Sequence, residues 1–244
     1  MIGQKTLSPP YDEKYFEGLN RHSFWGNNRY RECQRIHTLE TLCQPQKNDD
    51  LLELGCGTGH YTRLLAPRVR RIVGVDFSEA AIRKARAEHC AENTQYLLAD
   101  IQDLGQFPQE TFQKIVAIDV LEHLTDGQFA NVMNEANRLL TLKGLLILFT
   151  PCGTHWIERF KGRNLLIKQT AGHIGVRTEQ EIRDFIQRSG LQVKEVIRHE
   201  TCIPFLRLLE RRFKKIPAIG NLFVSRLGIS ASKTGREPDE GSAQ

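Results

Sequence analysis

Between residues 50 and 150, short apolar segments alternate with longer segments whose apolar residues recur every three or four positions. The short segments, which are typical of β-strands, lie at residues 51–54, 71–75, 95–99, 114–118 and 144–150. The periodic segments, which are typical of amphipathic helices, lie at residues 58–66, 78–91 and 126–140. Because the strands are apolar along most of their length, we expect a parallel sheet that helices cover on both faces.

The composition of the sequence changes after Pro151. Residues 152–177 are rich in glycine and basic side chains, and we expect a loop suited to a lid. Thr178 and Glu181 form a capping-box pattern that predicts the start of a helix. The remaining predicted elements are strands at 191–199 and 227–233, with two short amphipathic helices at 203–216 and 217–225.

These elements predict one α/β domain in three layers, with a mostly parallel sheet of seven strands and helices on both faces. Residues 1–49, which hold many aromatic side chains and a helical stretch, are expected to cap the site or to pack on the sheet. The predicted organisation of the 244 residues is a cap (1–49), a core (50–150), a substrate-side half (151–233) with a helical insert (203–225), and a disordered tail (234–244).

Composition is that of an ordinary globular protein, with 40% hydrophobic and 26% charged residues. No apolar run reaches the ~20 residues that a membrane span needs, and the first residues lack the layout of a secretory signal. The six cysteines include no C-x-x-C pair, which disfavours a zinc or redox site and suits neutral thiols in a reducing compartment. We therefore expect a cytoplasmic protein.

Charge is mildly positive, because 34 Lys and Arg residues face 29 Asp and Glu residues, a net charge of +5. This value by itself does not indicate a nucleic-acid partner. The cations are concentrated late in the chain, at Arg198, Arg207, Arg211, Arg212, Lys214, Lys215 and Arg226. Apolar residues share one side of the same helical segment, at Phe205, Leu206, Leu209, Phe213 and Ile216. Three roles are therefore expected for segment 203–225: it lies on an anionic membrane surface, folds over the sheet, or forms a dimer contact. The protein is accordingly expected to be a monomer or a homodimer.

The chemistry of the chain is concentrated in residues 51–59, Leu-Leu-Glu-Leu-Gly-Cys-Gly-Thr-Gly. A predicted strand runs directly into Gly55, Gly57 and Gly59, which allow a sharp turn and a close approach of the backbone to a ligand. The helix that follows would direct free N–H groups at that ligand. The segment thus predicts a loop that binds a nucleotide-like cofactor.

Acidic residues surround this loop. Glu53 precedes it, Asp76 ends the second strand, and Asp100 ends the third. A carboxylate at position 76 can accept hydrogen bonds from both hydroxyls of a ribose. The loop has no Lys or Arg for a phosphate, and its G-x-G-x-G spacing differs from the dinucleotide G-x-G-x-x-G. These features favour a nucleoside without phosphates, which can carry a positive charge.

Five segments in order resemble the class I S-adenosylmethionine-dependent methyltransferases, over about residues 50–150. They are Leu-Glu-Leu-Gly-Cys-Gly-Thr-Gly (52–59), Val-Gly-Val-Asp-Phe-Ser (73–78), Leu-Leu-Ala-Asp-Ile (97–101), Ile-Asp-Val-Leu-Glu-His-Leu (118–124) and Leu-Leu-Thr-Leu-Lys-Gly-Leu-Leu-Ile (139–147). The resemblance implies a Rossmann-like fold and S-adenosylmethionine as cofactor. It assigns the cofactor site to Glu53, Gly55, Cys56, Gly57, Gly59, Asp76, Phe77, Asp100, Ile101, Asp119 and Val120. Within it, the loop approaches the methionine part, Asp76 the ribose and Asp100 with Ile101 the adenine.

The residues after the fourth strand are the candidates for catalysis. Glu122 and His123 stand where ligands of open α/β sheets bind, and either can remove a proton or simply brace the next helix. This run also resembles the ubiquinone-biosynthesis O-methyltransferases and the small-RNA 2′-O-methyltransferases. In those proteins an acid-x-x-Glu-His run and a later histidine can hold a divalent metal, which implies Asp119, Glu122, His123 and His173 as candidate ligands. His173 is also a candidate catalytic residue.

The favoured function is transfer of a methyl group to the oxygen of a small lipophilic acceptor. One alternative is an RNA 2′-O-methyltransferase, although the charge is mild and no RNA-binding appendage is recognisable. The other is a partner subunit that binds S-adenosylmethionine without catalysis.

Overall fold

A computed structural model describes residues 28–162, 174–217 and 219–233. Its strands are β1 (Asp50–Leu54), β2 (Arg71–Asp76), β3 (Thr94–Leu98), β4 (Phe112–Ile118), β5 (Leu140–Pro151), β6 (Leu191–His199) and β7 (Arg226–Lys233). The described helices are α2 (Asn28–Thr38), α3 (His60–Leu65), α4 (Glu79–Glu88), α5 (Asp126–Leu139), α6 (Trp156–Gly162), α7 (Glu179–Arg188) and α8 (Pro204–Phe213). All seven predicted strands are confirmed, with boundaries that differ by a few residues.

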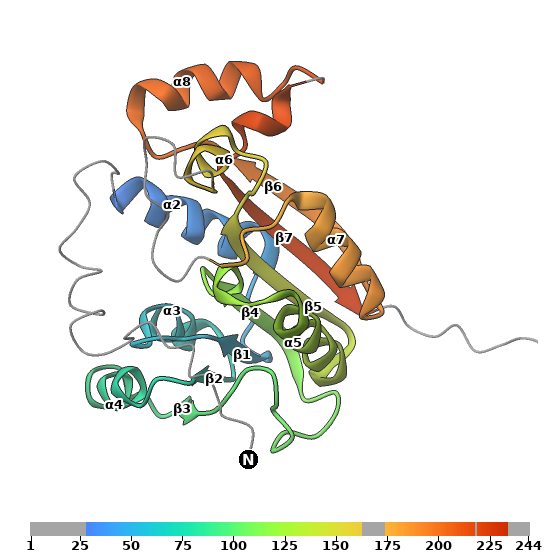
Figure 1. Cartoon of the computed structure of the whole chain (residues 1–244). Coiled ribbons are helices and arrows are strands. Elements are labelled where there is room, and N and C mark those ends of the chain that lie inside the picture. The colour runs from blue at the N-terminus through green and yellow to red at the C-terminus, as the bar shows by residue number, and fades with distance from the viewer. Residues whose placement is uncertain (1–27, 163–173, 218, 234–244) are drawn as a thin grey trace, which may run out of the picture.

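The seven strands form one sheet in the order β3-β2-β1-β4-β5-β7-β6 (Figure 1). Pairs from β3 to β5 are parallel, whereas β7 runs antiparallel to both β5 and β6. Antiparallel pairing places Arg226, at the start of β7, opposite Pro151, at the end of β5. Arg226 therefore lies at the same edge of the sheet as the carboxyl ends of the parallel strands, where ligands of such sheets bind.

Helices cover both faces of the sheet, as the apolar strands predicted. Leu52 and Leu54 pack in one buried cluster with Phe129 of α5 and Ile182 of α7. Leu51 points to the other face, where the cluster includes α3 and the helical turn Leu39–Cys43 that continues α2. This alternation along β1 is the period of a strand that is buried on both sides.

The caps predicted from sequence form in the structure. The side chain of Ser78 accepts a hydrogen bond from the backbone N–H of Ala81 and begins α4. The reciprocal contacts of Thr178 and Glu181 form the predicted capping box of α7. Each cap satisfies backbone groups that a helix leaves free at its first turn.

Three predicted features lie partly or wholly outside the described residues, and the first is the cap at 1–49, of which only residues 28–49 are described. The predicted loop 152–177 contains α6, and its residues 163–173, including His173, are outside the described part, as is the tail from residue 234.

The helical insert between β6 and β7 is confirmed as α8 and a short turn at Gly220–Phe223. In the described part of the chain, no helix is long and apolar enough to cross a membrane.

Arg177 holds the segment before α7 against the turn that follows β4. Its guanidinium, which is 5% exposed, donates to the backbone oxygens of Leu121, Leu124 and Gly175. It also pairs with Asp126 at 2.8 Å. The hydrogen bonds to Leu121 and Leu124 are buried, so the arginine helps to fix the turn at Leu121–His123.

We expect Arg177→Leu to lower the free energy of unfolding by about 3 kcal/mol, because the variant leaves buried carbonyl oxygens without donors. Urea denaturation followed by circular dichroism measures this change. Arg188→Leu, at the exposed end of α7, is the matched control and should change stability by less than ~0.5 kcal/mol. Equal losses in the two variants would contradict the proposed role of Arg177.

Candidate functional site

The glycine loop turns tightly between β1 and α3. Gly55, Gly57 and Gly59 have φ angles of 69°, 52° and 85°, in the left-handed region that favours glycine. A Cβ atom on Gly55 would lie 2.5 Å from Cγ2 of Val120, so no side chain fits there. The loop therefore packs directly against Val120, the residue that follows Asp119. This contact brings the end of β1 next to the end of β4.

Asp76 contacts this loop from the end of β2. Its Oδ2 accepts a hydrogen bond of 2.8 Å from the backbone N–H of Gly57, and its Oδ1 accepts one of 2.8 Å from that of Ser78. Burial raises the pKa of Asp76, and these backbone donors partly offset that effect. Two accepted hydrogen bonds leave lone pairs on both oxygens for a ligand diol. Beside it, the aromatic side chain of Phe77 is 59% exposed.

The two other predicted cofactor acids differ in environment. Glu53 is buried and accepts a hydrogen bond from the hydroxyl of Thr62 in α3. Burial raises the pKa of Glu53 to about 8, and the same environment raises that of the Cys56 thiol. Asp100 is exposed and accepts hydrogen bonds from Gln102, while Ile101 next to it is buried.

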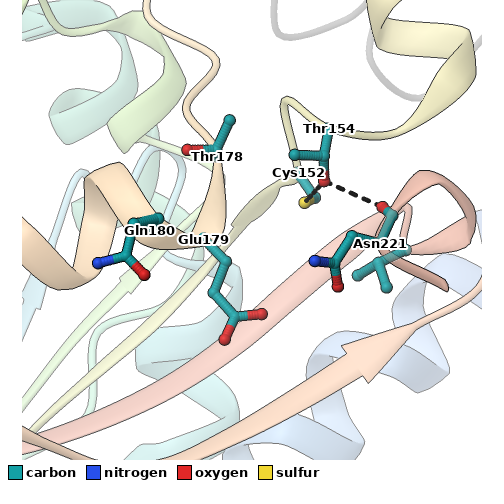
Figure 2. Close-up of a pocket in the computed structure, with 7 residues that line it drawn as sticks. Cys152, Thr154, Thr178, Glu179, Gln180 and Asn221 are labelled. Atoms are coloured by element: carbon teal, nitrogen blue, oxygen red, sulfur yellow. Dashed lines mark hydrogen bonds between the residues drawn. The ribbon is translucent and has the colours of Figure 1, made fainter. Parts of the chain in front are cut away.

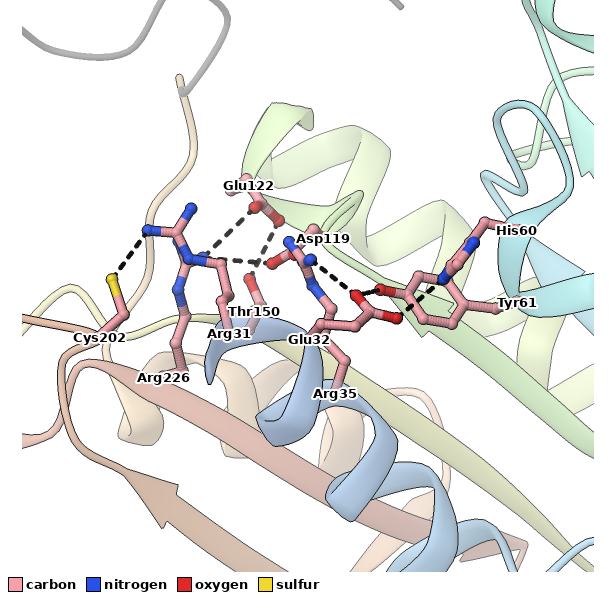
Figure 3. A network of polar contacts seen from close by, with 10 residues as sticks. All are labelled: Arg31, Glu32, Arg35, His60, Tyr61, Asp119, Glu122, Thr150, Cys202 and Arg226. Atoms are coloured by element: carbon pink, nitrogen blue, oxygen red, sulfur yellow. Dashed lines mark hydrogen bonds and ion pairs between the residues drawn. The ribbon is translucent and has the colours of Figure 1, made fainter. Parts of the chain in front are cut away.

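Asp119 lies at the centre of an ionic network at the end of β4 (Figure 3). Its φ is 51°, an uncommon conformation for a residue other than glycine. Arg35 of α2 donates from Nε to Oδ2 at 2.7 Å, and Arg226 of β7 donates to Oδ1 at 3.2 Å. Burial alone would raise the pKa of Asp119, but the two guanidinium charges outweigh that effect and lower it.

Glu122 belongs to the same network but has the opposite electrostatic environment. It is 2% exposed, accepts a hydrogen bond of 3.3 Å from the hydroxyl of Thr150, and lies 3.8 Å from Arg226. Burial raises the pKa of Glu122, and the charge of Asp119 raises it further. A carboxyl group with a raised pKa beside an ionised one is an arrangement typical of acid–base sites.

Glu32 joins α2 to the start of α3. It accepts hydrogen bonds from Tyr61 at 2.7 Å and from His60 at 2.8 Å when that ring nitrogen carries a proton (Figure 3). Burial would raise the pKa of Glu32, but these contacts and Arg35 lower it to about 2. Helix α2 is thus attached to the end of the glycine loop and, through Arg35, to Asp119.

Several residues of this network were not predicted from sequence, namely Arg35, Glu32, Tyr61 and Thr150. Arg226 was noticed only as one of many late cations. No local pattern marks them, because they come from α2, α3, β5 and β7 and meet only in the fold. One signal in the sequence could have identified Arg226, which directly precedes the predicted last strand. If that strand is antiparallel, it begins at the edge where the parallel strands end and ligands bind.

The metal-binding prediction has little support from the arrangement. In the part of the chain that the structure describes, no three His, Cys, Asp or Glu side chains are grouped as metal ligands would be. Asp119 is paired with two arginines, which a cation at that carboxylate would have to displace. His123 is partly buried on the turn after β4, and His173 is outside the described residues.

A small cavity lies at the end of β5, next to the first turn of α7 (Figure 2). Its volume is about 190 Å³, and its lining is Cys152, Thr154, Thr178, Glu179, Gln180, Asn221 and Val224. Typical ligand pockets measure about 300–1,000 Å³. None of the predicted cofactor residues lines the cavity, and burial raises the pKa of the Cys152 thiol, which makes it a poor nucleophile.

Comparison with known proteins agrees with this geometry. The profile of a family described as "Methyltransferase domain" matches residues 24–196. A probable S-adenosylmethionine-dependent methyltransferase of Mycolicibacterium smegmatis is 24% identical over 189 residues, which cover 78% of this chain and 67% of that protein. The chain spans between about half and two thirds of the length of the first relatives it matches.

Other relatives act on different acceptors, according to their names. A ubiquinone biosynthesis O-methyltransferase of Pseudomonas syringae pv. tomato is 24% identical over 202 residues, 75% of this chain and 83% of that one. A 23S rRNA (uracil(1939)-C(5))-methyltransferase of Stenotrophomonas maltophilia is 32% identical over 120 residues, 44% of this chain and 27% of that one.

Solved structures share the fold. The geranyl diphosphate C-methyltransferase of Streptomyces coelicolor A3(2) superposes with a TM-score of 0.63 at 15% identity, over 96% of this chain and 89% of that one. The family match covers more than half of the chain, and the strand order and glycine loop agree with it. The chain therefore belongs to the Methyltransferase domain family and has the Rossmann-like fold of the class I S-adenosylmethionine-dependent methyltransferases.

Proposed function

We propose that this protein transfers a methyl group from S-adenosylmethionine to an acceptor held at the carboxyl edge of its sheet. The observation that carries the proposal is the contact between Asp76 and the backbone N–H of Gly57, which joins the ribose-binding acid to the glycine loop. The residues around the loop suit a cofactor with a sulfonium charge, because carboxylates are frequent there and the loop has no cation for a phosphate.

The acceptor we propose is a small lipophilic molecule that is methylated at oxygen. The named ubiquinone biosynthesis O-methyltransferase supports this class, since it aligns over most of both chains. The rRNA relative aligns over less than half of this chain, and a net charge of +5 is weak for a protein that binds RNA by its phosphates. RNA is therefore the second candidate.

S-adenosylmethionine supplies an electrophilic methyl group, and the acceptor oxygen attacks it in line with the carbon–sulfur bond, whose electron pair leaves with sulfur. The protein must hold the acceptor and remove its proton. We assign proton removal to Glu122, because its environment brings its pKa closer to neutral pH than that of an exposed carboxyl group. Asp119 is held by Arg35 and Arg226 as a permanent anion and is the poorer base.

In this proposal Arg226 is a positioning residue. It contacts Asp119 at 3.2 Å and lies 3.8 Å from Glu122, so its charge keeps two neighbouring carboxyl groups at the end of β4. Thr150 donates to one oxygen of Glu122 and fixes the orientation of that side chain.

We expect Asp76→Asn to weaken binding of S-adenosylmethionine about tenfold or more, because charged hydrogen-bond acceptors contribute more than neutral ones. Isothermal titration calorimetry with S-adenosylmethionine measures the dissociation constant. The control is Asp103→Asn, an exposed acid whose carboxylate accepts from Gly105 outside the loop, and it should bind as the wild type does. If the wild type bound a nicotinamide dinucleotide and not S-adenosylmethionine, the proposed function would be wrong.

We expect Glu122→Gln to lower kcat by about 10²–10⁴-fold, because general base catalysis typically contributes that much. The measurement is transfer of a labelled methyl group from S-adenosylmethionine to a panel of phenols and catechols. Affinity for S-adenosylmethionine should stay within about threefold, since the side chain is assigned to the acceptor. A partner subunit without catalysis would give no transfer with the wild type, while binding S-adenosylmethionine normally.

The pH dependence of kcat tests the same assignment. A base acts when it is ionised, so the rate should increase as pH rises through the pKa of Glu122, which burial and Asp119 raise above its ordinary value. In Glu122→Gln the increase should disappear. A pH profile that is the same in both proteins would assign proton removal to another group.

A further inference from the structure

Helix α8 turns large apolar side chains toward solvent. Phe205 is 85% exposed, Leu208 is 61% exposed and Leu209 is 55% exposed. Phe213, Ile216 and Ile219 continue the apolar surface and are between 38% and 41% exposed. The sequence predicted an amphipathic helix here without deciding what its apolar side faces, and in the structure that side faces solvent. Clusters of this kind on a protein surface usually mark an interaction site.

A buried carboxylate fixes this orientation. Glu210 is fully buried, and one of its oxygens lies 2.9 Å from Nε2 of His155 and accepts from Nε1 of Trp156. The other accepts a hydrogen bond of 2.6 Å from the backbone N–H of Thr201. Rotating the helix to bury its apolar side would expel Glu210 from these partners and leave them unsatisfied. The outward apolar face is therefore part of the stable fold.

The charged side chains that segment 203–225 exposes have one sign. Glu210 is the only acidic residue in segment 203–225, and it is turned inward. The same segment has five cations, at Arg207, Arg211, Arg212, Lys214 and Lys215. Lys214 pairs with Glu200 at 2.7 Å, and Arg211 lies 3.6 Å from the same carboxylate. Arg211, Arg212 and Lys215 are exposed.

We propose that α8 docks this protein on an anionic lipid bilayer, with the side chains of Phe205, Leu208 and Leu209 among the lipid chains and the exposed cations at the headgroups. An apolar stripe flanked by cations is the pattern of a helix that lies in the plane of a membrane surface. The charges also favour this occupant over a second copy of the same face, since a symmetric dimer would bring like charges together.

The docking face is connected to the candidate site by α2. Arg31 of α2 donates to Sγ of Cys202, just before α8, and Arg207 of α8 lies 4.2 Å from the ring centre of Tyr30 in α2. Arg35 of the same helix holds Asp119. Figure 1 shows α8 beyond the end of β6 and the start of β7, on the side where α2 begins. If the acceptor is lipophilic, as proposed above, docking would bring the site close to the phase that dissolves it.

The test is flotation of the full chain with vesicles. Vesicles of phosphatidylcholine that contain phosphatidylglycerol should carry the protein to the top of a density gradient at low salt, and vesicles of phosphatidylcholine alone should carry little. Binding should fall as salt is added, because surface charges are screened.

Two variant pairs separate the apolar and the ionic contributions. Leu208→Asp with Leu209→Asp should weaken vesicle binding about tenfold or more, because each leucine inserted contributes a large share of the affinity. Arg212→Glu with Lys215→Glu should have a similar effect at low salt and little at high salt. Circular dichroism and binding of S-adenosylmethionine should match the wild type in both pairs.

Matched controls lie at the opposite edge of the sheet. Leu142→Asp removes a leucine that is 59% exposed, and Lys143→Glu with Arg188→Glu makes the same change in charge as the α8 pair. These variants should float as the wild type does.

If the wild type fails to float with anionic vesicles at low salt, or if the controls lose binding as strongly as the α8 variants, the proposal is wrong. Self-association that only the α8 variants abolish, measured by light scattering without vesicles, would instead assign the face to a second copy. Because binding of S-adenosylmethionine is measured separately, failure of docking leaves the proposed methyl transfer intact.

Discussion

The arrangement of the candidate site depends on one carboxylate, that of Asp119. It is held from two sides, by Arg35 of α2 and by Arg226 at the start of β7. The two contacts fasten α2 and β7 to the carboxyl end of β4, next to the glycine loop. Because the ion pairs are largely shielded from solvent, removing one partner would leave a charge without compensation. We infer that α2 and the start of β7 are kept in place by this interaction.

The acids of the site differ in protonation behaviour because their polar partners differ, although burial acts on all of them in the same direction. Glu53 and Glu122 lie among few donors, and burial raises the pKa of each. Asp119 and Glu32 are partly buried, but neighbouring arginines lower the pKa of Asp119, and His60, Tyr61 and Arg35 lower that of Glu32. The neighbours Asp119 and Glu122 therefore differ in role in our proposal, one as a fixed anion and one as a base. Their separation in the sequence, three positions, would not suggest such a difference.

Helix α8 shows how one buried polar group can decide which side of a helix faces solvent. Its sequence fits a helix packed on the sheet as well as one that faces a membrane. The spacing of apolar residues shows that they share one side of the helix, but not what that side contacts. Glu210 fixes the direction, since it is buried against His155, Trp156 and Thr201 and the apolar side chains of α8 are left exposed. Contact of this exposed face with a membrane is our proposal. A glutamate in the middle of a basic segment would ordinarily be read as an exposed partner of the cations around it.

The sequence by itself determined the layered α/β fold, the seven strands and the residues of the glycine loop, because strand periodicity, caps and glycine spacing are local properties of the chain. It also identified Asp76, Asp119 and Glu122 as candidate site residues, since each follows a predicted strand at the ligand-binding edge. Only the tertiary structure decided which partners these acids have. Arg35, Glu32 and Arg226 are distant from them in sequence and approach them because α2 packs beside α3 and β7 runs antiparallel to β5. Ionisation and the direction of an amphipathic helix depend on such distant neighbours, and no local pattern records them.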